Sequence, residues 1–129
     1  MPPRVNQQET QQESMPLYFY HATPSVNARS IALRGLQPRS VGGAGPYLCM
    51  SGIESGATTL GRAASDIIFR VASWNLDRAS WQRVGAGLNE WRSTAAIPPQ
   101  GLEFRRYLGS VEQQRWRPAS EYSQTAANW

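Results

Sequence analysis

Three side chains that could act together on a ligand lie far apart in this chain of 129 residues. His21, the only histidine, ends the apolar run "PLYFYHA" just before an expected helix, whose N-terminus attracts anions. Tyr47, in "GPYLCMS", offers a flat aromatic face on which a ring can stack. Glu90, in "GLNEWRST", lies in an expected strand. Glutamate is uncommon in strands, so its presence there is a candidate functional signal.

Each of these residues also has a plain structural alternative. His21 could satisfy a single backbone hydrogen bond, Tyr47 could pack on the core, and Glu90 could face solvent. Cys49 shares a strand face with Tyr47 and is expected to be a buried structural thiol. A serine hydrolase is disfavoured because no G-x-S-x-G elbow occurs, and pairing Glu54 with Glu90 as glycosidase carboxylates has little support. One cysteine and one histidine supply no zinc-ligand set, so no metal is expected.

The elements that would position these residues are short strands and few helices. Strands are expected over 16–22, 46–51, 66–72, around 90–93 and at the end of 98–111, and helices over 24–34 and 52–65. Residues 36–45 form a glycine-rich loop, and 73–87 are irregular with a turn of helix. This order indicates the α+β class.

The first helix carries the clearest boundary signals. Thr23 is the expected N-cap, Pro24 the first helical residue and Gly35 the stop. Val26, Ile31 and Leu33 are expected to face the core. His21 is therefore held between a strand end and a helix start.

The two ends of the chain are rich in polar residues, whereas the apolar residues that could form a core lie between them. We expect a disordered polar tail over 1–15, a folded domain over 16–111 and a polar extension over 112–129. In that extension, Trp116 and Trp129 either dock back on the domain or contact a partner. No leader peptide or run of about 20 apolar residues is visible, so a cytoplasmic protein, or an effector secreted into a target cell, is expected, with no membrane partner.

The charge balance favours an anionic ligand. The formal net charge is +4, and all 13 basic residues are arginines. Between residues 17 and 110, ten arginines stand against five carboxylates. Arginine forks suit phosphate and pyrophosphate, so a dinucleotide or nucleic acid is expected, although a solvated basic surface is the simpler alternative.

Taken in order, the segments "YHATPSVNARSIALRGLQP", "PYLCMS", "DIIFRV" and "NEWRSTAAIPPQGLEF" resemble the ADP-ribosyltransferase fold family. The opening is similar to the H-G-T segment of the RNA 2′-phosphotransferases and of small bacterial rifampicin-modifying transferases. The resemblance covers about residues 17–110. It implies a split β-sandwich of two small sheets with one or two flanking helices, and NAD as the substrate that supplies ADP-ribose.

The resemblance also implies roles for individual residues, in the H-Y-E arrangement. His21 would bind and orient a ribose hydroxyl of NAD, Tyr47 would stack on nicotinamide, and Glu90 would stabilise the ribosyl cation. Ala22 and Thr23 match the two positions after the histidine, where the family usually has glycine first, and the backbone at Ala22 would hold the nicotinamide amide.

Two further residues are assigned to the dinucleotide. Ser51, which ends the strand of Tyr47, is either part of the cofactor site or a helix N-cap. Arg39 is assigned to the pyrophosphate, with Arg29 and Arg34, near the same helix and loop, as the alternatives. The second histidine of the phosphotransferases is absent, because Pro46 and Tyr47 stand in its place, so removal of an RNA 2′-phosphate is not expected.

The leading hypothesis is therefore an NAD-dependent ADP-ribosyltransferase of bacterial toxin or effector type. It would release nicotinamide and modify an acceptor protein, nucleic acid or small molecule that the sequence does not identify. The chemistry supports such a trio independently, because a carboxylate stabilises the positive charge that develops at C1′ when the nicotinamide–ribose bond breaks. The alternatives are a catalytically degenerate module that binds NAD, a nucleotide or an RNA end, and a basic RNA-interaction module whose binding falls steeply with salt.

Overall fold

The fold is known from a computed structural model that describes residues 15–41, 44–61, 65–85, 89–126 and 129. The expected polar tail lies outside these residues except for Met15, which packs against the core. The strands are β1 (Tyr18–Thr23), β2 (Arg39–Val41), β3 (Ala44–Ser51), β4 (Ile67–Ala72), β5 (Trp81–Gly85), β6 (Glu90–Ser93), β7 (Leu102–Arg106) and β8 (Arg117–Pro118). The α-helices are α2 (Ser25–Arg34), α3 (Glu54–Gly61) and α4 (Tyr122–Thr125), and four short 3₁₀ turns complete the elements.

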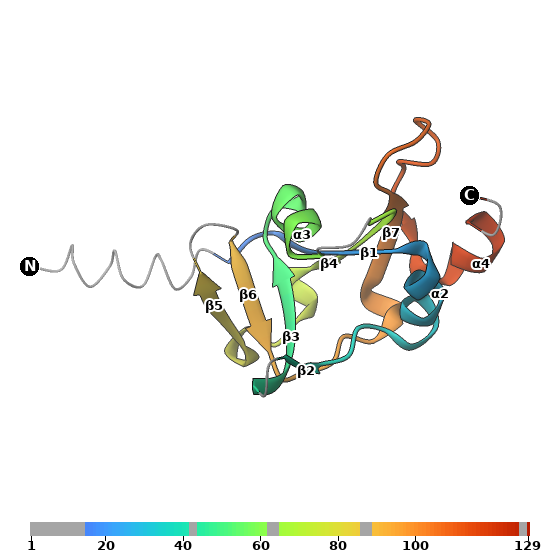
Figure 1. The fold of residues 1–129 in the computed structure, drawn as a ribbon. Coiled ribbons are helices and arrows are strands. Elements are labelled where there is room, and N and C mark those ends of the chain that lie inside the picture. The colour runs from blue at the N-terminus through green and yellow to red at the C-terminus, as the bar shows by residue number, and fades with distance from the viewer. Residues whose placement is uncertain (1–14, 42–43, 62–64, 86–88, 127–128) are drawn as a thin grey trace, which may run out of the picture.

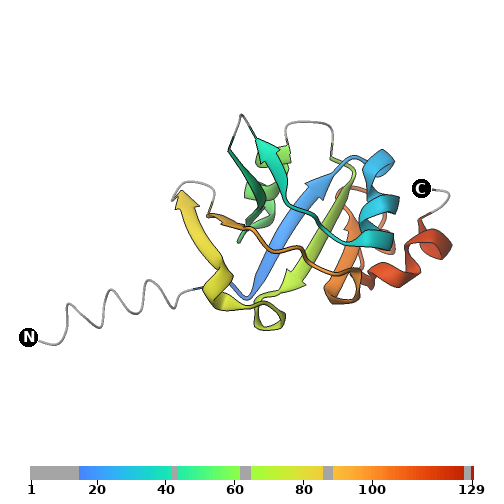
Figure 2. The ribbon, with the colours of Figure 1, turned by 90° about the horizontal axis from the view of Figure 1, so that it is seen from below.

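The strands form one antiparallel sheet in the order β5-β6-β3-β1-β4-β7-β8, with β2 paired to β3. The expected α+β class is confirmed, but the expected pair of separate sheets is not. The β5-β6-β3 half and the β1-β4-β7-β8 half belong to one sheet of eight strands. They meet where Tyr20 of β1 lies opposite Ser51 of β3. On its other side β1 pairs with β4 over its whole length, so β1 and β4 run side by side through the molecule (Figure 2).

The main core lies inside the curve of this sheet. Phe19 of β1 stacks on Trp81 of β5, with ring centroids 5.0 Å apart, and packs near Trp91 of β6 at 5.5 Å. Because β5 and β6 lie beyond β3 in the strand order, the sheet must bend for these rings to meet. A second cluster forms on the outer face, where α3 covers β1 (Figure 1). The sheet therefore has packed side chains on both faces around β1.

The helix α2 ends as expected but begins and packs differently. Gly35 has φ 82°, and a side chain there would meet the Ile97 carbonyl oxygen at 2.0 Å, so glycine is required. Thr23 is not the N-cap: it is the last residue of β1 and buried, and Pro24 takes the cap position. The Asp66 carboxylate accepts a hydrogen bond from the Ser25 amide at 3.4 Å instead.

The core face of α2 was also predicted incorrectly in part. Val26 is 83% exposed and Leu33 is 64% exposed, while Ala28 and Ala32 are buried and Ile31 is partly buried. Small residues let the helix approach the core closely, at the end of the molecule where α4 also packs (Figure 2). The short helix therefore buries its alanines and leaves larger apolar side chains in solvent.

Other boundaries also differ from expectation. The loop expected over 36–45 contains the strand β2, which pairs with β3, and β3 begins at Ala44 rather than at residue 46. Within the segment expected to be irregular, residues 81–85 form β5, because Trp81 enters the core and the strand pairs with β6. The other side chains described in β5 are exposed, so the segment lacks the alternation that identifies a half-buried strand. The helix expected over 52–65 is α3, which is shorter, and residues 62–64 lie outside the described residues.

The C-terminal segment packs onto the sheet. β8 pairs with β7, Tyr122 meets Phe104 edge-on at 5.0 Å, and the Trp129 ring lies 5.7 Å from the same phenylalanine. Between β7 and β8, residues 107–116 form a loop that stands out from the body of the molecule (Figure 1). Of the described helices, none has both the length and the apolar character needed to cross a bilayer.

Candidate active site

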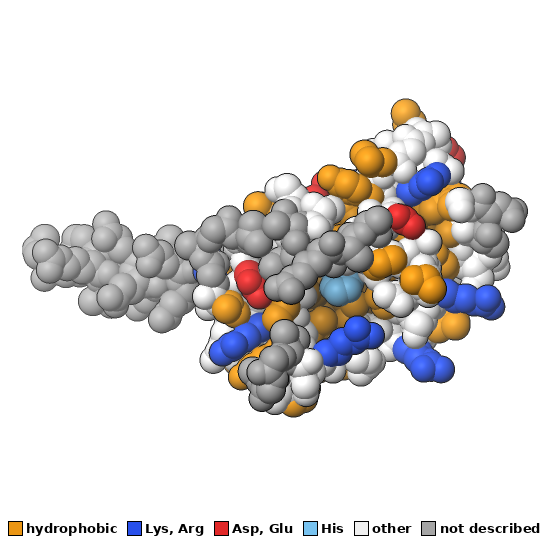
Figure 3. Space-filling view, viewed as in Figure 1, with side chains coloured by type: hydrophobic (Ala, Val, Ile, Leu, Met, Phe, Trp, Pro, Cys, Tyr) orange, Lys and Arg blue, Asp and Glu red, His pale blue; other side chains and the backbone are white. Residues whose placement is uncertain are grey.

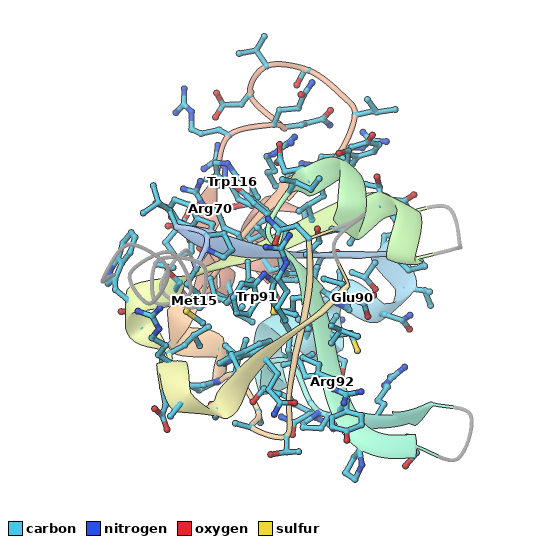
Figure 4. The ribbon with its side chains drawn as sticks, turned by 90° about the vertical axis from the view of Figure 1, so that its left-hand side faces the viewer. Met15, Arg70, Glu90, Trp91, Arg92 and Trp116 are labelled. Atoms are coloured by element: carbon cyan, nitrogen blue, oxygen red, sulfur yellow. The ribbon has the colours of Figure 1, made fainter. Side chains whose placement is uncertain are left out.

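The candidate site is built around β3. Tyr47, Cys49 and Ser51 alternate along this strand and therefore share one face. The antiparallel register with β6 sets Cys49 opposite Arg92 and Ser51 opposite Glu90, so these two β6 side chains join that face. Figure 4 shows Glu90 and Arg92 on one side of β6 and Trp91 on the other. As expected from the period of two, Trp91 is buried.

Glu90 is in contact with the only cysteine of the chain. Burial raises the pKa of the Cys49 thiol, and the negative charge of Glu90 and a hydrogen bond with its side chain raise it further. Because these effects keep the thiol protonated, Cys49 is a poor nucleophile and a hydrogen-bond donor to the carboxylate. Cys49 therefore orients Glu90 rather than reacting itself.

His21 reaches the same strand from β1. Burial lowers the pKa of His21 from 6.5 to about 4, a hydrogen bond with the Cys49 backbone opposes this change, and the positive charge of Arg39 adds to it. The imidazole is therefore neutral at neutral pH, with one nitrogen that can donate and one that can accept. In Figure 3 the single histidine is visible at the surface, on a face that also carries arginine side chains.

Tyr47 lies between two arginines. Arg39 of β2 is its cross-strand partner, and the guanidinium carbon of Arg92 lies 4.2 Å from the centre of its ring. One face of the ring therefore carries a cation–π contact. With Arg39 also close enough to influence His21, the site holds two cations, one carboxylate and a neutral imidazole.

The other predicted binding residues contribute less through their side chains. Ala22 points to the face of β1 opposite His21, where it packs with Ala57 and Ile68. Thr23 is buried, with 4% of its surface exposed. Ser51 is also buried, and its hydroxyl accepts a hydrogen bond at 3.1 Å from the backbone of Ile53, just before α3.

Asn89 positions Glu90 and was not predicted from the sequence. It has φ 49°, a left-handed conformation in which asparagine is the least strained residue after glycine. Its side-chain oxygen accepts a hydrogen bond from the Trp91 indole at 2.8 Å, and its carbonyl accepts one from the Gly52 amide at 2.9 Å. An asparagine directly before the strand of Glu90 was the available signal for such a turn.

A second group of aromatic and charged residues lies on the outer face. The Arg70 guanidinium lies 4.2 Å from the ring centres of both Tyr18 and Trp116, and its Nε donates to Glu103 at 2.8 Å (Figure 4). A cavity of about 300 Å³ next to it is lined in part by Tyr18, Trp74 and Glu103. It contains none of the three predicted catalytic side chains, so we place the candidate site at β3.

Within the described residues, no three histidine, cysteine or acidic side chains gather as a metal-ligand group. Comparison of the chain with models of protein families gave no match, and comparison with curated protein sequences gave none either. The candidate function therefore depends on the geometry around β3.

Proposed function

We propose that this protein is an NAD-dependent ADP-ribosyltransferase. The observation that supports the proposal is that His21 of β1 and Glu90 of β6 both contact Cys49 of β3, two residues from Tyr47 on the same strand. His21 and Glu90 are far apart in sequence, so only the pairing of the strands brings them to Cys49. Their chemistry matches a reaction that needs a ribose ligand, a ring platform and a carboxylate.

Each residue has one task in the proposed reaction. The neutral imidazole of His21 hydrogen-bonds a ribose hydroxyl and fixes the sugar. Tyr47 supports the nicotinamide ring, and Glu90 stabilises the positive charge at C1′ as the bond from C1′ to the ring nitrogen breaks. The bonding electron pair leaves with nicotinamide, and a lone pair of the acceptor then forms the new bond to C1′ while the acceptor loses a proton. Arg39 is the cation available for the pyrophosphate.

The fold is compatible with the same proposal. In the split sandwich of this family, two small sheets diverge and the dinucleotide binds between them. Here the β5-β6-β3 half and the β1-β4-β7 half meet at Tyr20 and Ser51, next to His21. We propose that this junction corresponds to the family's split.

The test is release of nicotinamide from NAD by the purified protein, with and without candidate acceptors. Glu90→Gln should lower the rate about 100-fold or more, because the amide keeps the shape but loses the charge that stabilises the transition state. His21→Asn should also lower it. Glu103→Gln removes a carboxylate paired with Arg70 on the outer face, and it is the matched control that should keep activity. Wild-type protein that releases no nicotinamide, or Glu103→Gln that loses as much activity as Glu90→Gln, would contradict the proposal.

A second candidate is a module of the same fold that binds a nucleotide or an RNA end without catalysis. The contact between Arg92 and Tyr47 favours this second candidate. One face of the Tyr47 ring is occupied by a guanidinium, with which a phosphate could pair. This candidate expects NAD or a 5′-phosphorylated RNA to bind with no release of nicotinamide. A binding constant that falls steeply with salt and is unchanged in His21→Asn would instead indicate a general basic RNA surface.

A further inference from the structure

The guanidinium of Arg92 occupies a face of Tyr47, the ring assigned to nicotinamide. Its central carbon lies 4.2 Å from the ring centre, a distance at which a cation is attracted to the π-face. The strand register explains the placement: Arg92 lies opposite Cys49 and projects from the same face as Tyr47. We propose that Arg92 is a gate on the nicotinamide subsite, which the ring of NAD must displace; this inference rests on the proposed function.

The arginine resembles the group that it would exclude. Both the guanidinium and the nicotinamide ring of NAD are planar and carry one positive charge. Two such cations cannot share one face of Tyr47, and they repel each other if they approach together. On the face of Tyr47 that Arg92 occupies, the dinucleotide therefore gains stacking energy only after the arginine has moved away.

The guanidinium of Arg92 is also not fully satisfied where it lies. Its Nε atom is buried, and among the described residues it has no hydrogen-bond partner. A buried donor without a partner is unfavourable, and this cost offsets part of the cation–π attraction. Glu90 lies two residues away on the same face of β6, so a carboxylate is close by when the guanidinium leaves the ring.

Free nicotinamide is the probe that tests the gate, because it is neutral and has no phosphate to pair with an arginine. Titration calorimetry would measure its dissociation constant for wild type, Arg92→Ala and Arg92→Gln. Removal of the competing cation should tighten binding of nicotinamide about fivefold in both variants. Arg83→Ala, which removes an exposed cation from the adjacent strand β5, is the matched control and should leave the constant unchanged.

The outcomes separate the gate from the proposed function. If wild type cleaves NAD but Arg92→Ala and Arg92→Gln bind nicotinamide no more tightly than wild type, the gate is wrong and the activity stands. Equal tightening by Arg83→Ala would also overturn the gate, because the effect would then be one of net charge. If neither wild type nor any variant binds nicotinamide or NAD, the gate and the proposed function fail together. A thermal unfolding midpoint for each variant shows that the comparison is made on folded protein.

Discussion

The lone histidine makes a sharp prediction about how stability depends on pH. The pKa of His21 is lowered from 6.5 to about 4 in the folded protein, mainly by burial. Between these two values the unfolded chain binds a proton that the folded protein does not bind. Stability must therefore fall as the pH drops from neutral towards 4, since a raised proton concentration favours the unfolded state.

The size of the effect follows from the two pKa values. With a pKa of 6.5 in the unfolded chain and about 4 in the folded protein, His21 is mostly neutral in both states at pH 7. Its protonation therefore takes almost nothing from the free energy of unfolding at that pH. The loss is ~2 kcal/mol by pH 5 and ~3 kcal/mol by pH 4. Other groups titrate in the same range, so the quantity to compare is the difference between wild type and His21→Gln, whose side chain stays neutral at every pH.

Urea unfolding from pH 7 to pH 4 measures this difference directly. Wild type should lose ~3 kcal/mol more than His21→Gln over that interval. Proton NMR provides an independent measurement, because one histidine gives one Hε1 signal, whose shift should titrate near pH 4. A titration midpoint near 6.5, or a difference between wild type and variant that does not change with pH, would refute the claim that the imidazole is desolvated against β3.

Two further predictions concern residues that support the site and the core. Asn89→Ala should destabilise the protein by ~2 kcal/mol, because it leaves the Trp91 indole unpaired and strains a backbone with φ 49°. Asn89→Gly relieves the strain and should cost less in chemical denaturation; the reverse order would contradict this account. Tyr122→Ala should cost ~3 kcal/mol through lost packing on Phe104, whereas Val111→Ala, at a residue 89% exposed, should leave the unfolding midpoint unchanged.

The Asn89 turn shows that the position of Glu90, the proposed catalytic carboxylate, depends on more than its own strand. Glu90 is placed on its face by the alternation of β6, but the direction of the strand at its first residue depends on the left-handed asparagine before it. The bond to Trp91 links that turn to the core, and the bond to Gly52 links it to the end of β3. A substitution at Asn89 is therefore expected to shift the position of the Glu90 carboxylate, although none of these hydrogen bonds of Asn89 involves Glu90.

The sequence by itself determined the local features. The strand over 90–93, the strand that became β4 and the end of α2 at Gly35 follow from alternation, apolar runs and the freedom of glycine to adopt positive φ. The placement of Trp91 inside and Glu90 outside follows from the same period of two. These features depend on residues within a few positions of each other, so the pattern along the chain contains them.

Only the tertiary structure decided which strands are neighbours. The pairing of β3 with β6 brings Cys49 to Glu90 and Arg92 to Tyr47, and no local pattern specifies that register. The burial of His21, the strand β5 and the packing of Tyr122 have the same origin. Each depends on contacts between distant segments, whose free energy comes from apolar surface that is buried only when the whole sheet assembles.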